Sequence, residues 1–125
     1  MGRSASNTVI IVEDDVGLTQ ALTRILRLGG LSPVTYTSAE ALLASDGVEQ
    51  AMCLILDVQL PGINGFALRE RLLAKHAIPP VVFITAFDEP EARSEAMRAG
   101  ASFLAKPFSG RVLLETIRQM QAVSS

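Results

Sequence analysis

CLILDVQLPGING, residues 53–65, is the most informative stretch of this chain. A short apolar run ends in one carboxylate, Asp57, and then in a cluster of turn-forming residues. An apolar run closed by turn residues is typical of a strand buried on both faces of a sheet. Asp57 therefore stands where a buried strand opens into a loop, the edge at which open parallel α/β sheets bind their ligands. Because a buried ionised carboxylate is costly without a cation or a reaction that uses it, Asp57 is the candidate reactive centre.

Strands and helices alternate along the rest of the chain. Runs of β-branched and apolar residues predict five strands, at 8–12, 33–36, 53–56, 81–84 and 101–105. Apolar residues at helical spacing follow each strand, and helix N-caps are expected at Ser38, Asn64 and Ser109. Asp88 and Glu91 have the spacing of a capping box. Strand–helix alternation without a repeat or an interdomain linker predicts one doubly wound (βα)5 domain of the α/β class with a parallel sheet.

The overall composition further narrows the classes of protein to which this chain could belong. A chain of 125 residues that is 49% hydrophobic and 19% charged suits one globular domain. The net charge of −2 predicts no direct nucleic-acid contact from this segment, and no apolar run approaches the ~20 residues of a membrane span. The single Cys53 has no partner for an internal disulfide, which favours a reducing, cytoplasmic location. We expect a disordered N-terminal tail at 1–7, the domain at 8–122, and a linker or C-terminal tail from 123 to 125.

Polar side chains follow four of the five predicted strands: Glu13 and Asp14, Asp57, Thr85, and Lys106. Parallel strands point the same way, so these side chains should converge on one edge of the sheet. Three neighbouring carboxylates repel one another by roughly several kcal/mol at an effective dielectric of about 20, so a cation must offset that repulsion. Oxygen ligands suit a hard divalent cation, which predicts Mg²⁺ as the cofactor, with Mn²⁺ as an alternative.

The same set of residues is suited to phosphoryl chemistry. Lys106 brings a positive charge that can pair with Asp57 or an arriving anion, and Thr85 brings a hydroxyl that can donate to a phosphoryl oxygen. A carboxylate flanked by these groups and Mg²⁺ can attack phosphorus and form an acyl phosphate. Taken singly, each residue has an ordinary explanation: a helix-dipole partner, a turn residue or a solvated lysine. Their joint occurrence at four strand ends favours the chemical interpretation.

These residues resemble the receiver domain of bacterial two-component response regulators over about residues 8–122. The matching pieces are Val12-Glu13-Asp14-Asp15, Asp57-x-x-x-Pro61-x-x-x-Gly65, Thr85-Ala86, Ala99-Gly100-Ala101 and Lys106-Pro107-Phe108. The resemblance implies a flavodoxin-like sheet of order 2-1-3-4-5. The amino-acid sequence of the later loops is similar to that of regulators with a helix-turn-helix output domain. Transcription regulation by a DNA-binding domain outside this segment is the implied output.

The resemblance also implies the roles of individual residues. Asp57 is expected to accept a phosphoryl group from a histidine on a partner kinase, so that the domain catalyses only its own phosphotransfer and autodephosphorylation. The implied Mg²⁺ ligands are the carboxylates of Asp14 and Asp57, the backbone carbonyl of Gln59 and, through water, Glu13.

A conformational switch is implied as well. Thr85 and Lys106 are expected to contact the phosphoryl oxygens, the Lys106–Pro107 bond to be cis, and Phe103 to be the switch aromatic. Only Ser102 separates Ala101 from Phe103, where the family usually has two residues. When the Thr85 hydroxyl is drawn to the phosphate, Phe103 would turn inward and change the face of the fourth helix, fifth strand and fifth helix. That face would then pair with a second receiver as a homodimer, or release an output domain.

Other functions fit the sequence less well. A degenerate receiver, acting as a phosphate-independent interaction module, would be expected to lack Asp57, Thr85 or Lys106, and all three are present. A Mg²⁺-dependent phosphohydrolase that resembles the haloacid dehalogenases needs a second acid two residues after its nucleophile, where this chain has Gln59. A nucleotide-binding flavodoxin-like domain needs a glycine-rich loop after the first strand, where acids stand.

Overall fold

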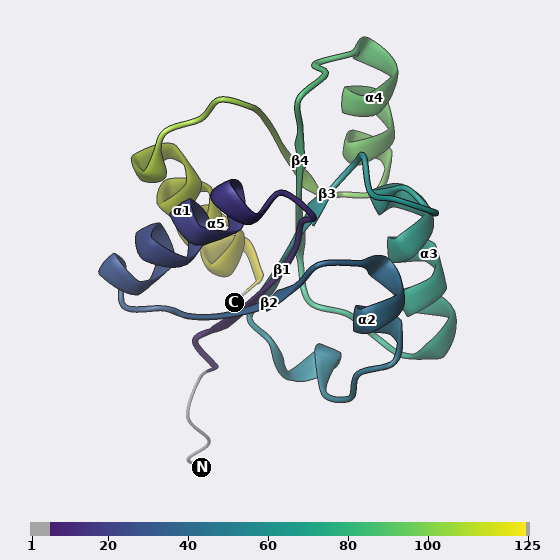
Figure 1. Ribbon diagram of the computed structural model, residues 1–125, viewed down its shortest axis with the longest axis horizontal. Coiled ribbons are helices and arrows are strands. Elements are labelled where there is room, and N and C mark those ends of the chain that lie inside the picture. The colour runs from purple at the N-terminus through teal and green to yellow at the C-terminus, as the bar shows by residue number, and fades with distance from the viewer. Residues whose placement is uncertain (1–5, 125) are drawn as a thin grey trace.

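The structure is a computed structural model that describes residues 6–124, and it is built around one central sheet (Figure 1). Along the chain the elements are β1 (Thr8–Val12), α1 (Val16–Leu28), β2 (Ser32–Tyr36), α2 (Ala39–Leu43), a 3-10 helix η1 (Val48–Gln50), β3 (Cys53–Asp57), α3 (Gly65–Lys75), β4 (Val81–Thr85), α4 (Pro90–Arg98), β5 (Ser102–Ala105) and α5 (Gly110–Ser124). All strand pairs are parallel, in the order β2-β1-β3-β4-β5. The predicted fold and sheet order are confirmed.

Helices cover both faces of the sheet, with α1 and α5 on one side and α2, α3 and α4 on the other (Figure 1). Side chains alternate between the two layers with the period of two that strands impose. Ile11 and Ile55 pack in the cluster with α1 and α5, whereas their neighbours Val12 and Leu56 pack in the cluster with α2, α3 and α4. Every residue of β3 and of β4 is buried. These two central strands therefore form a rigid base for whatever lies at their carboxyl ends.

Three of the expected helix caps are present. A side-chain oxygen accepts a hydrogen bond from the backbone N–H three residues ahead at Ser38, Asn64 and Ser109. The capping box expected from Asp88 and Glu91 is wrong: Glu89 is the N-cap residue of α4 and makes no side-chain cap. The Asp88 carboxylate instead forms two hydrogen bonds with the guanidinium of Arg93. Charge-assisted bonds of this kind are stronger than a bond to a neutral backbone N–H, which explains the exchange of partners.

The termini bear on the predicted domain boundaries, which stay a prediction. The expected tail at 1–7 lies outside the described residues except at Ser6 and Asn7, and the Asn7 carbonyl accepts a hydrogen bond from Ser32 N–H at 2.9 Å. Helix α5 continues to Ser124, past the expected domain end at 122. Of the helices within residues 6–124, none combines the length and the apolar character that crossing a bilayer requires.

Candidate functional site

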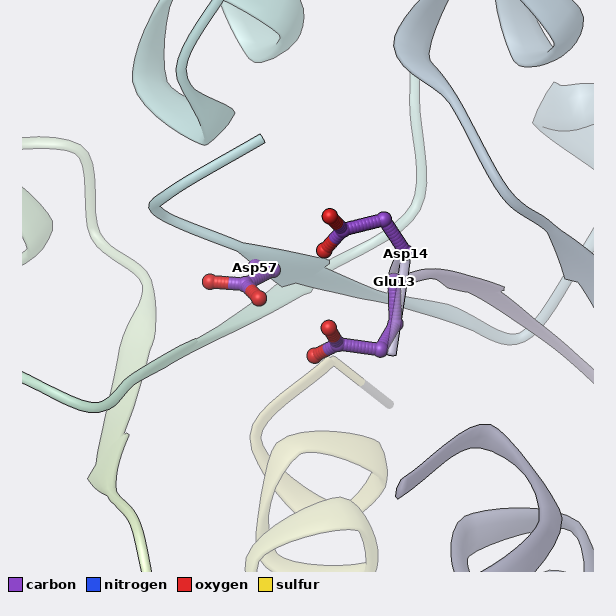
Figure 2. A group of neighbouring side chains, drawn as sticks. All are labelled: Glu13, Asp14 and Asp57. Atoms are coloured by element: carbon purple, nitrogen blue, oxygen red, sulfur yellow. The ribbon is translucent and has the colours of Figure 1, made fainter. Parts of the chain in front are cut away.

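Three carboxylates meet at the carboxyl edge of the sheet (Figure 2). Glu13 and Asp14 directly follow β1, and Asp57 ends β3, the strand that pairs with β1. Each residue offers one carboxylate oxygen, and these oxygens lie within 4.8 Å of one another. Glu13 and Asp57 are buried while Asp14 is exposed, so the group opens to solvent on one side. The convergence expected from parallel strands is present.

Lys106 reaches this cluster from the loop after β5. Its ammonium lies 3.1 Å from Glu13 Oε1 and 3.1 Å from Asp57 Oδ2. Since β5 is separated from β3 by β4, the lysine side chain spans a strand to bridge the two acids. The side chain is 22% exposed, so water screens these ion pairs only partly. Three carboxylates against one ammonium leave the cluster with a net negative charge.

Burial and charge shift the titration of two of these groups. Burial raises the pKa of Glu13 to about 7, the neighbouring Asp57 adds to the rise, and the Asp15 N–H and Lys106 oppose it. Burial works against the charge of Lys106, but its hydrogen bonds to Glu13 and Asp57 outweigh that effect and raise the pKa of the lysine. The lysine therefore stays protonated, and the cluster still favours a further cation.

Backbone N–H groups hold the two buried carboxylates in place. Asp57 Oδ1 accepts a hydrogen bond from Gln59 N–H at 2.9 Å, and its other oxygen faces Lys106. Glu13 Oε2 accepts one from Asp15 N–H at 3.0 Å. The carboxylates are thus oriented before any ligand arrives, as a preorganised site requires.

The cluster suits a hard divalent cation. Glu13, Asp14 and Asp57 supply only carboxylate oxygens, which are the donors such cations prefer. One acid is exposed, so an ion held there could keep part of its water shell, as Mg²⁺ usually does.

Thr85 ends β4 at the same edge, but it is bonded to a different residue. Its hydroxyl oxygen lies 2.8 Å from Gln59 Oε1 and 3.2 Å from the Phe87 carbonyl, and it accepts a hydrogen bond from Phe87 N–H at 3.0 Å. Sequence reasoning expected the Gln59 backbone carbonyl as a metal ligand and missed the hydrogen bond between its side chain and Thr85. The signal that could have indicated this bond is that β3 and β4 are neighbours: Thr85 ends β4, and Gln59 comes two residues after the end of β3.

Phe103 and Pro107 lie on the β5 side of the site. Phe103 is paired with Phe83 in the register of β4 and β5. Although only Ser102 separates Ala101 from Phe103, the aromatic residue still lies within β5. The ring is partly buried, and the Arg93 guanidinium carbon lies 4.9 Å from its centroid. The Lys106–Pro107 peptide bond is cis.

Comparisons with known proteins agree with this geometry. The family model described as "Response regulator receiver domain" matches residues 9–118. The chain is 36% identical to nodulation protein W of Bradyrhizobium diazoefficiens and 32% identical to the transcriptional regulatory protein FixJ of Azorhizobium caulinodans, over 91% and 88% of its own length. It spans only 51% and 53% of those proteins. It is also similar to the solved structure of response regulator StyR, with 40% identity, a TM-score of 0.84, and coverage of 95% of this chain and 61% of that one. With its fold, its acidic cluster and this family match, the chain belongs to the response regulator receiver domains.

Proposed function

We propose that Asp57 is the phosphoacceptor of this receiver and takes its phosphoryl group from a histidine kinase. The observation that carries the proposal is the Lys106 ammonium, which lies 3.1 Å from both Asp57 and Glu13 beside a third acid. A single charge shared between two buried carboxylates fixes Asp57 in place. It also leaves a cation within reach of any anion that arrives at that oxygen.

The proposed reaction is a direct displacement at phosphorus. An Asp57 carboxylate oxygen attacks the phosphorus of a phosphohistidine, and the P–O bond forms as the P–N bond breaks. The imidazole nitrogen leaves with the electron pair and takes up a proton. The Thr85 hydroxyl, at the end of the neighbouring strand β4, and Lys106, after β5 one strand further, would then contact the phosphoryl oxygens.

The proposed cofactor is Mg²⁺. Asp14 and Asp57 would hold it directly together with the backbone carbonyl of Gln59, and Glu13 would act through water. When bound, such an ion offsets the charge of the transferring phosphoryl group. The support for this assignment is the all-oxygen donor set and the net negative charge of the cluster.

The proposed output is control of transcription through a partner domain outside this segment. Phosphorylation would shift Thr85 and Phe103 and so change the face formed by α4, β5 and α5, which would pair with a second receiver or release the output domain. The similarity of the chain to FixJ, a transcriptional regulatory protein, supports this output. We further propose a cytoplasmic location, because the buried thiol of Cys53 suits a reducing compartment.

Mass spectrometry of the intact protein tests the phosphoacceptor assignment. After incubation with acetyl phosphate and Mg²⁺, the wild type should gain the mass of one phosphoryl group, and the gain should disappear with EDTA. Asp57→Ala should gain nothing, whereas Asp46→Ala, which removes an exposed aspartate between α2 and η1, should behave as the wild type. A wild type that gains no phosphoryl mass at any Mg²⁺ concentration would favour the phosphate-independent interaction module instead.

A further inference from the structure

The Thr85 hydroxyl has one hydrogen to donate and two acceptors within reach. Gln59 Oε1 lies at 2.8 Å and the Phe87 carbonyl oxygen at 3.2 Å. The hydroxyl oxygen is at the same time the acceptor for Phe87 N–H, at 3.0 Å. The shorter distance assigns the hydrogen to Gln59. In the structure, therefore, the side-chain amide of Gln59 occupies the donor that the proposed function requires for a phosphoryl oxygen.

Thr85 and Gln59 differ in their access to water, and so in whether each can lose the other as a hydrogen-bond partner. Thr85 is 0% exposed, so its hydroxyl has no access to water and needs a protein or ligand partner. Gln59 is exposed, and its amide can be hydrated as soon as it is released. A phosphoryl group on Asp57 can therefore take the hydroxyl from Gln59 without leaving a buried polar group unpaired.

Gln59 is also tied to the phosphoacceptor itself. Its backbone N–H donates to Asp57 Oδ1 at 2.9 Å while its side chain holds the hydroxyl of Thr85. The residue thus connects the end of β3 to the end of β4 through two separate hydrogen bonds. Its backbone is fixed by the carboxylate, so the side chain is presented to Thr85 from a defined position.

We propose that Gln59 is a positioning residue whose side-chain amide competes with the phosphoryl group for the Thr85 hydroxyl and so favours the unphosphorylated arrangement. This inference rests on the proposed function and adds to it a residue that opposes the switch. The hydrogen bonds from Phe87 N–H to the Thr85 hydroxyl oxygen, and from Glu89 N–H to the Phe87 carbonyl, both at 3.0 Å, link the hydroxyl to the loop that enters α4. Gln59 would consequently restrain that loop as well.

A double-mutant cycle with a phosphoryl mimic tests this competition. The affinity for beryllofluoride in the presence of Mg²⁺ is measured by NMR titration for the wild type, Gln59→Met, Thr85→Val and the double variant. Gln59→Met keeps the length of the side chain but removes the acceptor. It should bind beryllofluoride about two- to fivefold more tightly, the fold-change for one net hydrogen bond when the weaker Phe87 acceptor remains. In the Thr85→Val background the same substitution should change nothing, because the hydroxyl for which Gln59 competes is gone.

Two controls separate competition from a general structural effect. Gln50→Met makes the same chemical change at an exposed glutamine of η1 and should leave the affinity as in the wild type. In the metal-free protein, Gln59→Met should shift the NMR signal of the Thr85 methyl group, because the hydroxyl changes partner.

The outcomes distinguish this inference from the proposed function. An affinity that stays the same or falls in Gln59→Met, with a wild type that binds the mimic, would overturn the role of Gln59 and leave Asp57 as phosphoacceptor. A gain in affinity that persists in the Thr85→Val background would overturn it as well, since the effect would not pass through the hydroxyl. A wild type that neither binds beryllofluoride nor becomes phosphorylated would overturn the proposed function.

Discussion

Gly65 is the first residue of α3, and it packs against the backbone of the proposed phosphoacceptor. A Cβ atom built at Gly65 would lie 2.5 Å from the Asp57 carbonyl oxygen, 3.1 Å from its carbonyl carbon and 3.2 Å from Val58 Cα. All three are backbone atoms, so no side-chain rotation can relieve the overlap. The Gly65 N–H also donates to the Val58 carbonyl at 3.0 Å, which ties the helix start to the end of β3. We therefore expect Gly65→Ala to push the loop away from Asp57.

The expected cost follows from two opposing effects. Overpacking against fixed atoms costs about 1–3 kcal/mol, and replacing a helical glycine by alanine returns up to ~1 kcal/mol. A net loss of about 1–2 kcal/mol corresponds to a melting temperature lower by roughly 3–10 °C for a domain of this size. Because the displaced atoms belong to Asp57, the affinity for beryllofluoride with Mg²⁺ should fall together with the stability.

Thermal unfolding by circular dichroism and titration with beryllofluoride measure the two effects. Gly17→Ala is the matched control: its Cβ would meet only Asp15 Oδ1, at 3.4 Å, within α1. This change should raise the melting temperature, since alanine is the better helix former and meets no backbone. If Gly65→Ala melted at the wild-type temperature and bound the mimic equally well, the expected overlap between its Cβ atom and the backbone of Asp57 would be refuted.

Three further perturbations test other parts of the structure. Lys106→Met should raise the affinity for Mg²⁺ by roughly tenfold, because the ammonium now 3.1 Å from Asp57 Oδ2 competes with the ion and is partly screened by water; calorimetry that shows weaker binding would contradict this. Burial raises the pKa of the Cys53 thiol to about 12 from an ordinary value of 9.0, so the unfolded thiol ionises first as the pH rises. Stability to urea should therefore be lost progressively between those two values, and less so in Cys53→Ala, while alkylation of the native thiol at pH 8 should be slow. Arg93→Gln removes the guanidinium that lies 4.9 Å from the Phe103 ring centroid, and should speed the motion of that ring in NMR relaxation; an unchanged ring would show that the cation does not restrain it.

The sequence predicted the site well where topology alone decides it. Glu13, Asp57 and Lys106 are far apart in the chain, yet parallel strands must deliver their carboxyl ends to one edge. The observed bridge from Lys106 to both acids follows from that rule together with opposite charge. Strand ends were also within one residue of the prediction, because each apolar run is closed by a turn residue or a polar group.

The sequence did not predict which of several near neighbours a polar side chain bonds. Asp88 stands where a capping residue would, but it pairs with Arg93 because that guanidinium returns to it from the first turn of α4. Whether Gln59 reaches Thr85 depends on its side-chain rotamer, and no periodicity encodes a rotamer. The short helix η1 was not predicted, since three residues after Gly47 are too few to show a helical period.

The hydrogen bonds already made at the site determine which of them must break on phosphorylation. Within the described side chains of residues 6–121, no buried nitrogen or oxygen lacks a hydrogen-bond partner. A phosphoryl group on Asp57 can therefore gain the Thr85 hydroxyl, which has one hydrogen, only if that hydroxyl gives up Gln59. Gln59 is exposed, so its amide can turn to water. The Lys106 ammonium has three hydrogens and makes two hydrogen bonds, to Glu13 and to Asp57, so it can contact a phosphoryl oxygen and still keep Glu13. Keeping that ion pair matters because Glu13 is 1% exposed, and a buried carboxylate that loses its cation is costly. The proposed transfer therefore breaks the bond between Thr85 and Gln59 but not the bridge from Lys106 to Glu13. The negative charge that a phosphoryl group adds beside three acids predicts that it and the divalent cation bind with positive cooperativity.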